Sequence, residues 1–354
     1  MTLQSTFYES INFFFALEGE QSLVKAMRME NRLPETVTSK IAISEIDLEP
    51  GPFCMSFNFS LEQLKSSIER FGVLNAPYVI KGLDSQYTVV TGYRRLLAVR
   101  ELDWTEVLCH VLAADFSPLE ALLLNFYDNI VHREMNEIEK AMVLERLNTY
   151  LKQEALMNEF MPMLGLSANR HNLDILLQIP KLEEQIRMSI ATQRISLRVA
   201  GLMMTLDSGD RLKVNELFTG LKVSFNQQWE VIQWIVEIAS REGQPPKEVL
   251  EDDALTEIMN NSKMSNPIKS KMIVNVLKKR RFPSLVKAER AFKKGVSSLS
   301  LPQGLKIIPP PFFEGKMYRL EIGFSQGDEL KEKVERLFRQ PGLEQITDFW
   351  KGTD

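Results

Sequence analysis

Apolar and polar positions between residues 41 and 72 change from a strand-like to a helical spacing. A short apolar run comes first, at Ile41, Ile43, Ile46 and Leu48, and it ends at Pro50-Gly51-Pro52. Leu61, Leu64, Ile68 and Phe71 then fall at helical spacing. Ser60 and Gln63 have the spacing of a capping box, and Gly72 has the place of a C-cap. We therefore expect a strand followed by a helix from about residue 61 to 71.

The rest of the chain divides into a mixed part, a helical part and a second mixed part. Strands are predicted at 78–81, 87–91 and 107–112, with a turn at 82–85 and a helix at 93–101. Helices are predicted at 118–129, 136–152, 154–164, 168–178 and 181–190, with more up to about residue 260. A strand at 305–308, a break at Pro309-Pro310-Pro311, a strand at 317–324 and a helix at 330–339 complete the pattern. The expected class is α+β, with an N-terminal arm (1–38), an α/β domain (39–115), a helical domain (116–260), a basic helical segment (261–298) and a C-terminal α+β module (299–354).

Composition and charge limit the cellular compartment and the kinds of binding partner that we expect for this chain. The chain has no apolar run long enough to span a membrane, and its apolar N-terminal cluster at residues 11–17 lacks the basic flank of a signal peptide. Two cysteines cannot form a disulfide framework, which favours the reduced cytoplasm. Residues 263–294 hold eleven Lys or Arg and one acid, Glu289, although the whole chain has a net charge of −4. A basic segment on an acidic body indicates a local contact with a polyanion.

The first candidate site is the stretch Thr91-Gly92-Tyr93-Arg94-Arg95, where a predicted strand ends and a helix begins. Free backbone N–H groups and the positive end of the helix dipole favour an anion there. Gly92 lets the backbone approach closely, and Arg94 and Arg95 can donate charge-assisted hydrogen bonds to phosphate. A surface arginine pair on an ordinary helix is the alternative interpretation.

The second candidate lies between two predicted helices, at Asp128-Asn129-Ile130-Val131-His132-Arg133. Asp128 and Asn129 offer oxygen ligands for Mg²⁺, and His132 and Arg133 can contact phosphate. The alternative is a helix C-terminus capped by Asn129, with His132 and Arg133 favoured by the dipole.

Two further stretches predict DNA contacts. Residues 164–173 resemble the turn and recognition helix of a helix-turn-helix motif, with Ser167 as the expected N-cap. Asn169, Arg170, His171 and Asn172 are residue types that read bases. Pro162 is expected to interrupt the preceding helix, so a scaffold that no longer reads sequence is the alternative. The second stretch, Lys278-Lys279-Arg280-Arg281, suits a phosphate backbone, or alternatively forms a solvated helix end.

In this order the motifs resemble the ParB family, whose N-terminal domain carries GERRxRA and ENxQRxxLxPxE boxes. Residues 92–98, GYRRLLA, match the first box, and residues 128–139, DNIVHREMNEIE, match the second. Upstream, Phe71-Gly72 and residues 73–77, VLNAP, resemble the family's turn, and Ile195-Ser196-Leu197 resembles a later helix start. The resemblance covers about residues 41–200, and it predicts a ParB/sulfiredoxin-like domain followed by an all-α helix-turn-helix-type domain.

This resemblance implies a DNA-binding protein of the partition or nucleoid-occlusion type that binds CTP with Mg²⁺ and closes as a clamp. Thr91, Gly92, Arg94 and Arg95 would hold the triphosphate, with Asp128 and Asn129 near the metal and His132 or Arg133 in place of the family's arginine. It also implies a homodimer, a ParA-type ATPase partner and a nucleoid-associated place in the cytoplasm.

The sequence departs from the family pattern at Tyr93, Asp128 and Val131, where the family has Glu, Glu and Gln. With these departures, we expect CTP hydrolysis to be weak at most. Two alternatives remain: a CTPase or small-molecule kinase using the same pocket, and an interaction protein that has lost the nucleotide. Sulfiredoxin shares the fold, but this chain has no thiol in the 91–94 turn, and Cys109 is expected in the core. The sequence offers no metal cluster that would support a nuclease.

Overall fold

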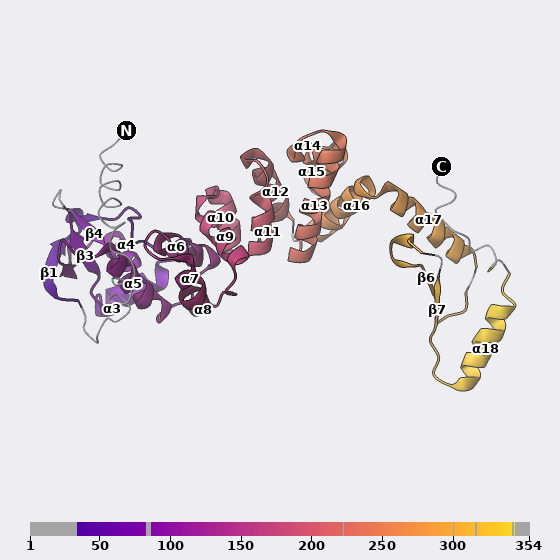
Figure 1. Ribbon diagram of the computed structural model, residues 1–354, viewed down its shortest axis with the longest axis horizontal. Coiled ribbons are helices and arrows are strands. Elements are labelled where there is room, and N and C mark those ends of the chain that lie inside the picture. Colours follow the sequence, from indigo (N-terminus) through magenta and orange to yellow (C-terminus); the bar gives the residue numbers. More distant parts are fainter. Residues whose placement is uncertain are drawn as a thin grey trace. The chain divides into compact units, whose positions relative to one another are not determined.

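The computed structural model describes residues 34–82, 86–221, 223–299, 301–315, 317–341 and 343. The chain forms two compact units, residues 1–201 and 202–354 (Figure 1). Most of the expected arm and of the 82–85 turn lies outside the described residues. None of the described helices is both long and apolar enough to cross a membrane.

The first unit begins with a five-stranded mixed sheet in the order β1-β5-β3-β4-β2. β1 pairs antiparallel with β5, β5 parallel with β3, β3 antiparallel with β4, and β4 parallel with β2. The strands are β1 (Thr36–Ala42), β2 (Ile46–Asp47), β3 (Tyr78–Lys81), β4 (Tyr87–Val89) and β5 (Glu106–Leu112). The expected single strand around 41–48 is therefore two strands separated by a 3₁₀ turn, Ile43–Glu45, and β1 starts inside the expected arm.

Helices α3 (Glu62–Phe71) and α4 (Tyr93–Glu101) pack against this sheet. Ile68 of α3 and residues 96–99 of α4 share one buried cluster with Val79, Val107 and Cys109. The expected core position of Cys109 is thus confirmed. Gly72 ends α3 at a φ of 74°, but the expected capping box is wrong, because Leu61 is the N-cap and Ser60 accepts only from the Glu62 N–H, at 3.3 Å.

The first unit continues as helices, in the order that the sequence predicted. They are α5 (Pro118–Ile130), α6 (Glu137–Leu147), α7 (Gln153–Ala155), α8 (Met161–Met163), α9 (Arg170–Gln178), α10 (Glu184–Ala191) and α11 (Leu197–Met203), the last crossing into the second unit. A π-helical turn, Leu156–Phe160, joins α7 to α8, so the chain stays helical as far as Met163. Pro162 therefore does not break this helix. The π turn, with its changed hydrogen bonding, ends at Phe160, two residues before the proline that lacks an N–H.

The second unit is a helical array followed by the expected small α+β module. Its helices are α12 (Ser208–Gly220), α13 (Phe225–Glu242), α14 (Pro246–Leu250), α15 (Asp253–Asn260), α16 (Asn266–Arg281) and α17 (Pro283–Ser298). Strands β6 (Leu305–Ile308) and β7 (Arg319–Ile322) form an antiparallel pair, and helix α18 (Gly327–Phe338) follows. None of the side chains of α18 is buried.

Candidate nucleotide and nucleic-acid sites

The end of β4 and the start of α4 meet at Gly92, at the junction where the sequence predicted an anion site. The Thr91 backbone N–H donates to the Tyr78 carbonyl at 3.1 Å, and the buried Thr91 hydroxyl accepts from the Tyr78 N–H at 3.4 Å. Gly92 has a φ of 80°, a left-handed conformation, and a Cβ at this position would lie 2.9 Å from the Pro77 Cβ. No side chain caps α4, so its first N–H groups and its dipole face the space in front of Gly92.

The two candidate motifs meet at this junction. The Arg95 guanidinium donates to the Asn75 carbonyl, and its Nη2 lies 3.0 Å from Asp128 Oδ2. Residue 95 belongs to α4 and residue 128 to the last turn of α5, so the fold joins motifs that lie 33 positions apart. The joint prediction of one site from both motifs is supported by this contact.

Arg94 and Arg133 share a single buried carboxylate, that of Glu139. Arg94 Nη2 pairs with Glu139 Oε1, and Arg133 Nη1 lies 2.6 Å from Glu139 Oε2. The Glu139 side chain is only 2% exposed, whereas the two arginine side chains are 24% and 18% exposed. Two guanidinium groups against one carboxylate leave this group of side chains with a net charge of +1.

The environment of Arg94 changes the pKa of its guanidinium group. Burial, and then the charge of Arg133, lower the pKa of the Arg94 guanidinium, while Glu139 opposes this shift. The Arg94 guanidinium also lies over the Phe59 ring, 4.5 Å from its centroid. A partly buried arginine with an uncompensated like charge beside it is a favourable partner for an anion.

The expected magnesium ligands are close together but already hydrogen-bonded. Asp128 Oδ2 accepts from Arg95, and Asn129 Oδ1 accepts from Arg133 Nε at 2.8 Å. Among the described residues there is no group of three or more His, Cys, Asp or Glu that could hold a metal ion. The remaining oxygen of Asp128 fits an ion held largely by a nucleotide's phosphates, since Mg²⁺ in such sites takes only one or two carboxylates from the protein.

His132 and Tyr93 lie outside the group of arginines around Glu139. His132 is exposed, and the structure brings Arg133, not His132, into the arginine pair. The Tyr93 hydroxyl donates to the Leu48 carbonyl at 3.2 Å, and burial raises the pKa of this phenol. Asn129 is not a C-cap, because α5 continues to Ile130 and the Asn129 amide donates to the Asn125 carbonyl at 2.9 Å.

Sequence reasoning gave no role to Asn125 or Glu139. The buried Asn125 amide donates to the Phe53 carbonyl at 3.0 Å and to the Val90 carbonyl. Glu139 is the third residue of a capping box on α6, in which the Asn136 side chain accepts from the Glu139 N–H and Glu139 accepts from the Asn136 N–H. The Asn-x-x-Glu spacing was visible in the sequence and would have marked the helix start, but not the two arginines.

Residues 153–178, where the sequence predicted a helix-turn-helix motif, form a helical stretch, a turn and helix α9. Gly165, at a φ of 68°, ends α8, with the Leu166 N–H bonded to the Met161 carbonyl and the Gly165 N–H to the Pro162 carbonyl. This is the Schellman pattern, and it turns the chain sharply before α9. The expected N-cap was wrong: Asn169, not Ser167, caps α9 and accepts from the Asn172 N–H at 2.8 Å.

Helix α9 presents polar side chains on the side away from its core. Asn169, Arg170 and His171 are exposed, and Asn172 is half-buried. Arg170 pairs with Asp174 at 2.9 Å in an exposed contact one turn along the helix. An exposed pair of this kind is worth at most about 1 kcal/mol, so it leaves Arg170 available to another acceptor.

The basic segment is arranged differently from the prediction. Arg280 pairs with Glu242 and Asp252, Arg281 with Glu237, and Lys278 with Glu289. Three of the four cations in the 278–281 cluster therefore hold helices together within the second unit. The exposed cations that have no recorded acidic partner within the described residues include Lys279 and four on α17: Lys287, Arg290, Lys293 and Lys294.

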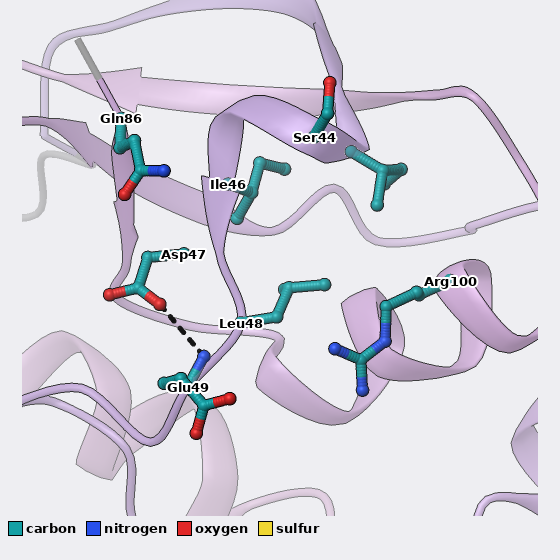
Figure 2. A pocket seen from close by; sticks show the side chains of 8 residues that line it. Ser44, Ile46, Asp47, Leu48, Glu49, Gln86 and Arg100 are labelled. Atoms are coloured by element: carbon teal, nitrogen blue, oxygen red, sulfur yellow. Dashed lines mark hydrogen bonds between the residues drawn. The ribbon is translucent and has the colours of Figure 1, made fainter.

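A separate pocket of about 330 Å³ lies beside the edge strand β2. Figure 2 shows Arg100 reaching from α4 towards Leu48 and Glu49, with Asp47 Oδ1 bonded to the Glu49 N–H. The lining residues are Ile43, Ser44, Ile46, Asp47, Leu48, Glu49, Gln86 and Arg100. None of the residues predicted to bind nucleotide or DNA lines this pocket.

Residues 27–130 match the family model of the ParB N-terminal domain. The chain is 29% identical over 237 residues to the nucleoid occlusion protein of Bacillus licheniformis, covering 64% of this chain and 80% of that protein. It is 27% identical over 222 residues to the probable chromosome-partitioning protein ParB of Campylobacter jejuni, covering 61% and 76%. Among solved structures, a C-terminally truncated ParB from Caulobacter crescentus complexed with CTP-γ-S matches at 17% identity with a TM-score of 0.24, covering 52% of this chain and 99% of that one.

The N-terminal part of the chain, residues 27–130, therefore matches the ParB N-terminal domain, which confirms the resemblance seen in the sequence. The match begins upstream of the expected domain start at residue 39 and runs past its expected end at 115, to the last residue of α5. It includes the Gly92 junction, Arg94, Arg95 and Asp128, but not Arg133 or Glu139.

Proposed function

We propose that this chain is a ParB-like DNA-binding protein of the partition or nucleoid-occlusion type whose N-terminal domain binds a nucleoside triphosphate. The observation that carries the nucleotide proposal is the uncapped start of α4 at Gly92, beside two guanidinium groups that share one carboxylate. This arrangement offers backbone N–H groups and a net positive charge to a polyphosphate. CTP with Mg²⁺ is the ligand that the ParB resemblance implies.

The geometry supports the following roles for the residues of this site. Gly92 allows close approach of the backbone, and Thr91 holds the strand end in place through Tyr78. Arg94 would donate to phosphate, Arg95 and Asp128 would form the wall towards α5, and Asp128 would offer one oxygen to Mg²⁺. Arg133 takes the place of the family's arginine, while the exposed His132 is a weaker candidate.

Binding rather than turnover is the activity that these contacts favour. Two carboxylates of the second motif lie beside the arginines of the site, those of Asp128 and Glu139, and each accepts a hydrogen bond from an arginine. The Tyr93 hydroxyl donates to a backbone carbonyl. No residue in the described part of the site is placed as an unpaired general base beside Gly92. A nucleotide-dependent closure of a homodimer, rather than catalysis, is thus the mechanism we propose.

DNA would be read by α9 and held by the exposed cations. Asn169, Arg170 and His171 are positioned on the exposed side of α9, after a turn of helix-turn-helix type. The names of the relatives, a nucleoid occlusion protein and a probable partitioning protein, support a chromosomal DNA partner. A homodimer, a ParA-type ATPase partner and a nucleoid-associated position in the cytoplasm complete this proposal.

Calorimetric titration tests the nucleotide proposal. CTP, ATP and GTP are titrated in Mg²⁺ into the wild type, Arg94→Ala and Arg100→Ala. Arg100 is the matched control, because it lies at the other end of α4 and is exposed. We expect CTP to bind the wild type and Arg100→Ala, and binding to be lost in Arg94→Ala. If no nucleotide binds the wild type, the nucleotide role is refuted, and an interaction protein on the same fold remains.

A further inference from the structure

Residues 53–57, here called the strap, form a segment without helix or strand in the connection between β2 and α3. Alternate residues of the strap are tied to α5 and to the residues before and within α6. The Phe53 carbonyl accepts from Asn125 at 3.0 Å, and the Met55 carbonyl from Arg133 Nη2 at 3.1 Å. The Phe57 carbonyl accepts from the Asn136 amide at 2.8 Å.

Glu139 joins this strap to the arginines of the nucleotide site. Its Oε1 accepts from the Phe57 N–H at 3.1 Å and from Arg94, while its Oε2 accepts from the Asn136 N–H at 3.1 Å and from Arg133 at 2.6 Å. Arg94 also donates from Nε to the Ser56 hydroxyl at 3.2 Å. The strap is therefore held at residues 56 and 57 by Arg94 and Glu139, two of the three side chains that determine the charge of the site.

The Glu139 carboxylate is itself the anion that Arg94 and Arg133 bind. It is buried, its two oxygens accept four hydrogen bonds in all, and two of the donors are guanidinium groups. A phosphate group is an oxyanion with the same preference for arginine donors but a larger charge. A phosphate in front of Gly92 and this carboxylate therefore compete for the N–H groups of Arg94.

We propose that Glu139 is an internal counter-ion that holds Arg94 and the strap when no ligand is bound, and that a polyphosphate draws Arg94 away from it and loosens the strap. The inference rests on the proposed nucleotide function. In this proposal Glu139 does not contact the ligand but affects its binding through Arg94.

The strap connects Arg94 and Glu139 with the helices of the first unit. The Arg187 guanidinium of α10 lies over the Phe57 ring, 5.1 Å from its centroid. Helix α6, which carries Glu139, packs against α9 and α10. A strap released at Phe57 would change the contacts of α6 and α10, and α6 packs directly against the candidate recognition helix α9.

Amide hydrogen exchange across the strap tests the proposal. The probes are CTP with Mg²⁺ and inorganic tripolyphosphate, which separates the phosphate chemistry from the base. In the wild type we expect either probe to raise exchange in a peptide covering 53–59, about tenfold or more at Phe57, while β3 is unchanged. Binding with unchanged exchange at Phe57 would overturn the counter-ion role and leave the nucleotide function standing.

Glu139→Gln provides the second measurement, with Asp128→Asn as the control that removes a carboxylate from Arg95 but not from the strap. We expect Glu139→Gln to show high exchange at Phe57 without ligand and to bind tripolyphosphate about tenfold more tightly, since the competing charge is gone. Asp128→Asn should keep the strap protected. Weaker binding by a folded Glu139→Gln would mean that Glu139 prepares Arg94 for the ligand, which contradicts competition.

The remaining outcomes are also decisive. If the wild type binds neither probe but Glu139→Gln binds tripolyphosphate, the counter-ion role is supported and the wild-type nucleotide function is not. If neither protein binds, both proposals fail. If Glu139→Gln does not fold, the wild-type exchange with and without ligand decides.

Discussion

Replacing Gly92 by alanine should destabilise the first unit and disturb the nucleotide site together. Gly92 has a φ of 80°, where a side chain is unfavourable by about 1–2 kcal/mol. The added Cβ would also lie 2.9 Å from the Pro77 Cβ and 3.0 Å from Arg95 Nε. The proline ring cannot rotate away, so we expect a further penalty of about 1–3 kcal/mol from overpacking.

Gly165→Ala is the matched control. Gly165 has a φ of 68°, close to that of Gly92, but a Cβ there would have no heavy atom within 4 Å. This variant therefore carries only the backbone term, about 1–2 kcal/mol. The difference between the two variants isolates the close approach of Gly92 to Pro77.

Hydrogen exchange in two places measures both variants. Peptides from β5 report on the sheet, and peptides from α9 report on the helix after Gly165. Relative to the wild-type rate of the same peptide, we expect exchange of β5 in Gly92→Ala to rise about 5- to 150-fold more than exchange of α9 in Gly165→Ala, because each 1.4 kcal/mol is a factor of ten. Movement of Arg95 should also weaken CTP binding in Gly92→Ala only. Equal losses in the two variants would refute the steric argument.

Three further predictions concern DNA binding and assembly. Arg170→Ala should weaken binding to a specific DNA site more than binding to random DNA, measured by fluorescence anisotropy; equal loss on both would mean that Arg170 only positions the helix. The triple variant Lys287→Glu, Arg290→Glu and Lys294→Glu should reduce the log–log salt slope of DNA binding by about three units, and a flat salt response of the wild type would contradict the phosphate contact. The control Arg281→Ala, which breaks the pair with Glu237, should mainly lower the unfolding temperature. Because α18 has no buried side chain, we expect a dimer by light scattering at micromolar concentration, and a monomer with and without nucleotide would contradict it.

The order of elements and the location of the site were visible in the sequence because they depend on local physics. Periodicity predicted β3, α4 and α9 within about two residues, since strand and helix spacing are properties of neighbouring residues. The Gly92 junction and its two arginines were visible because a glycine between a strand and a helix has few other roles. The ParB N-terminal domain was recognised from the same ordered motifs.

The helix caps and the strand near residue 41 were harder, because they depend on single hydrogen bonds. Ser60 and Ser167 have the right residue type for an N-cap, yet Leu61 and Asn169 take these positions. The apolar positions at 41–48 continue on both sides of Ser44 and Glu45, so their spacing did not reveal the 3₁₀ turn at Ile43–Glu45 between β1 and β2. Boundaries of this kind are decided by backbone partners elsewhere in the sheet.

Only the tertiary structure decided which charges are available. In the sequence, residues 278–281 form the densest cluster of cations, but their acidic partners lie 11 to 44 positions away, and folding pairs three of them. The same holds for Glu139, an ordinary capping residue in the sequence that becomes the shared counter-ion of Arg94 and Arg133. The sequence thus determined which chemical groups the protein has and near which turns they lie. The fold decided which of them neutralise one another, because charge pairing depends on distances of a few ångströms between segments that are far apart in the chain.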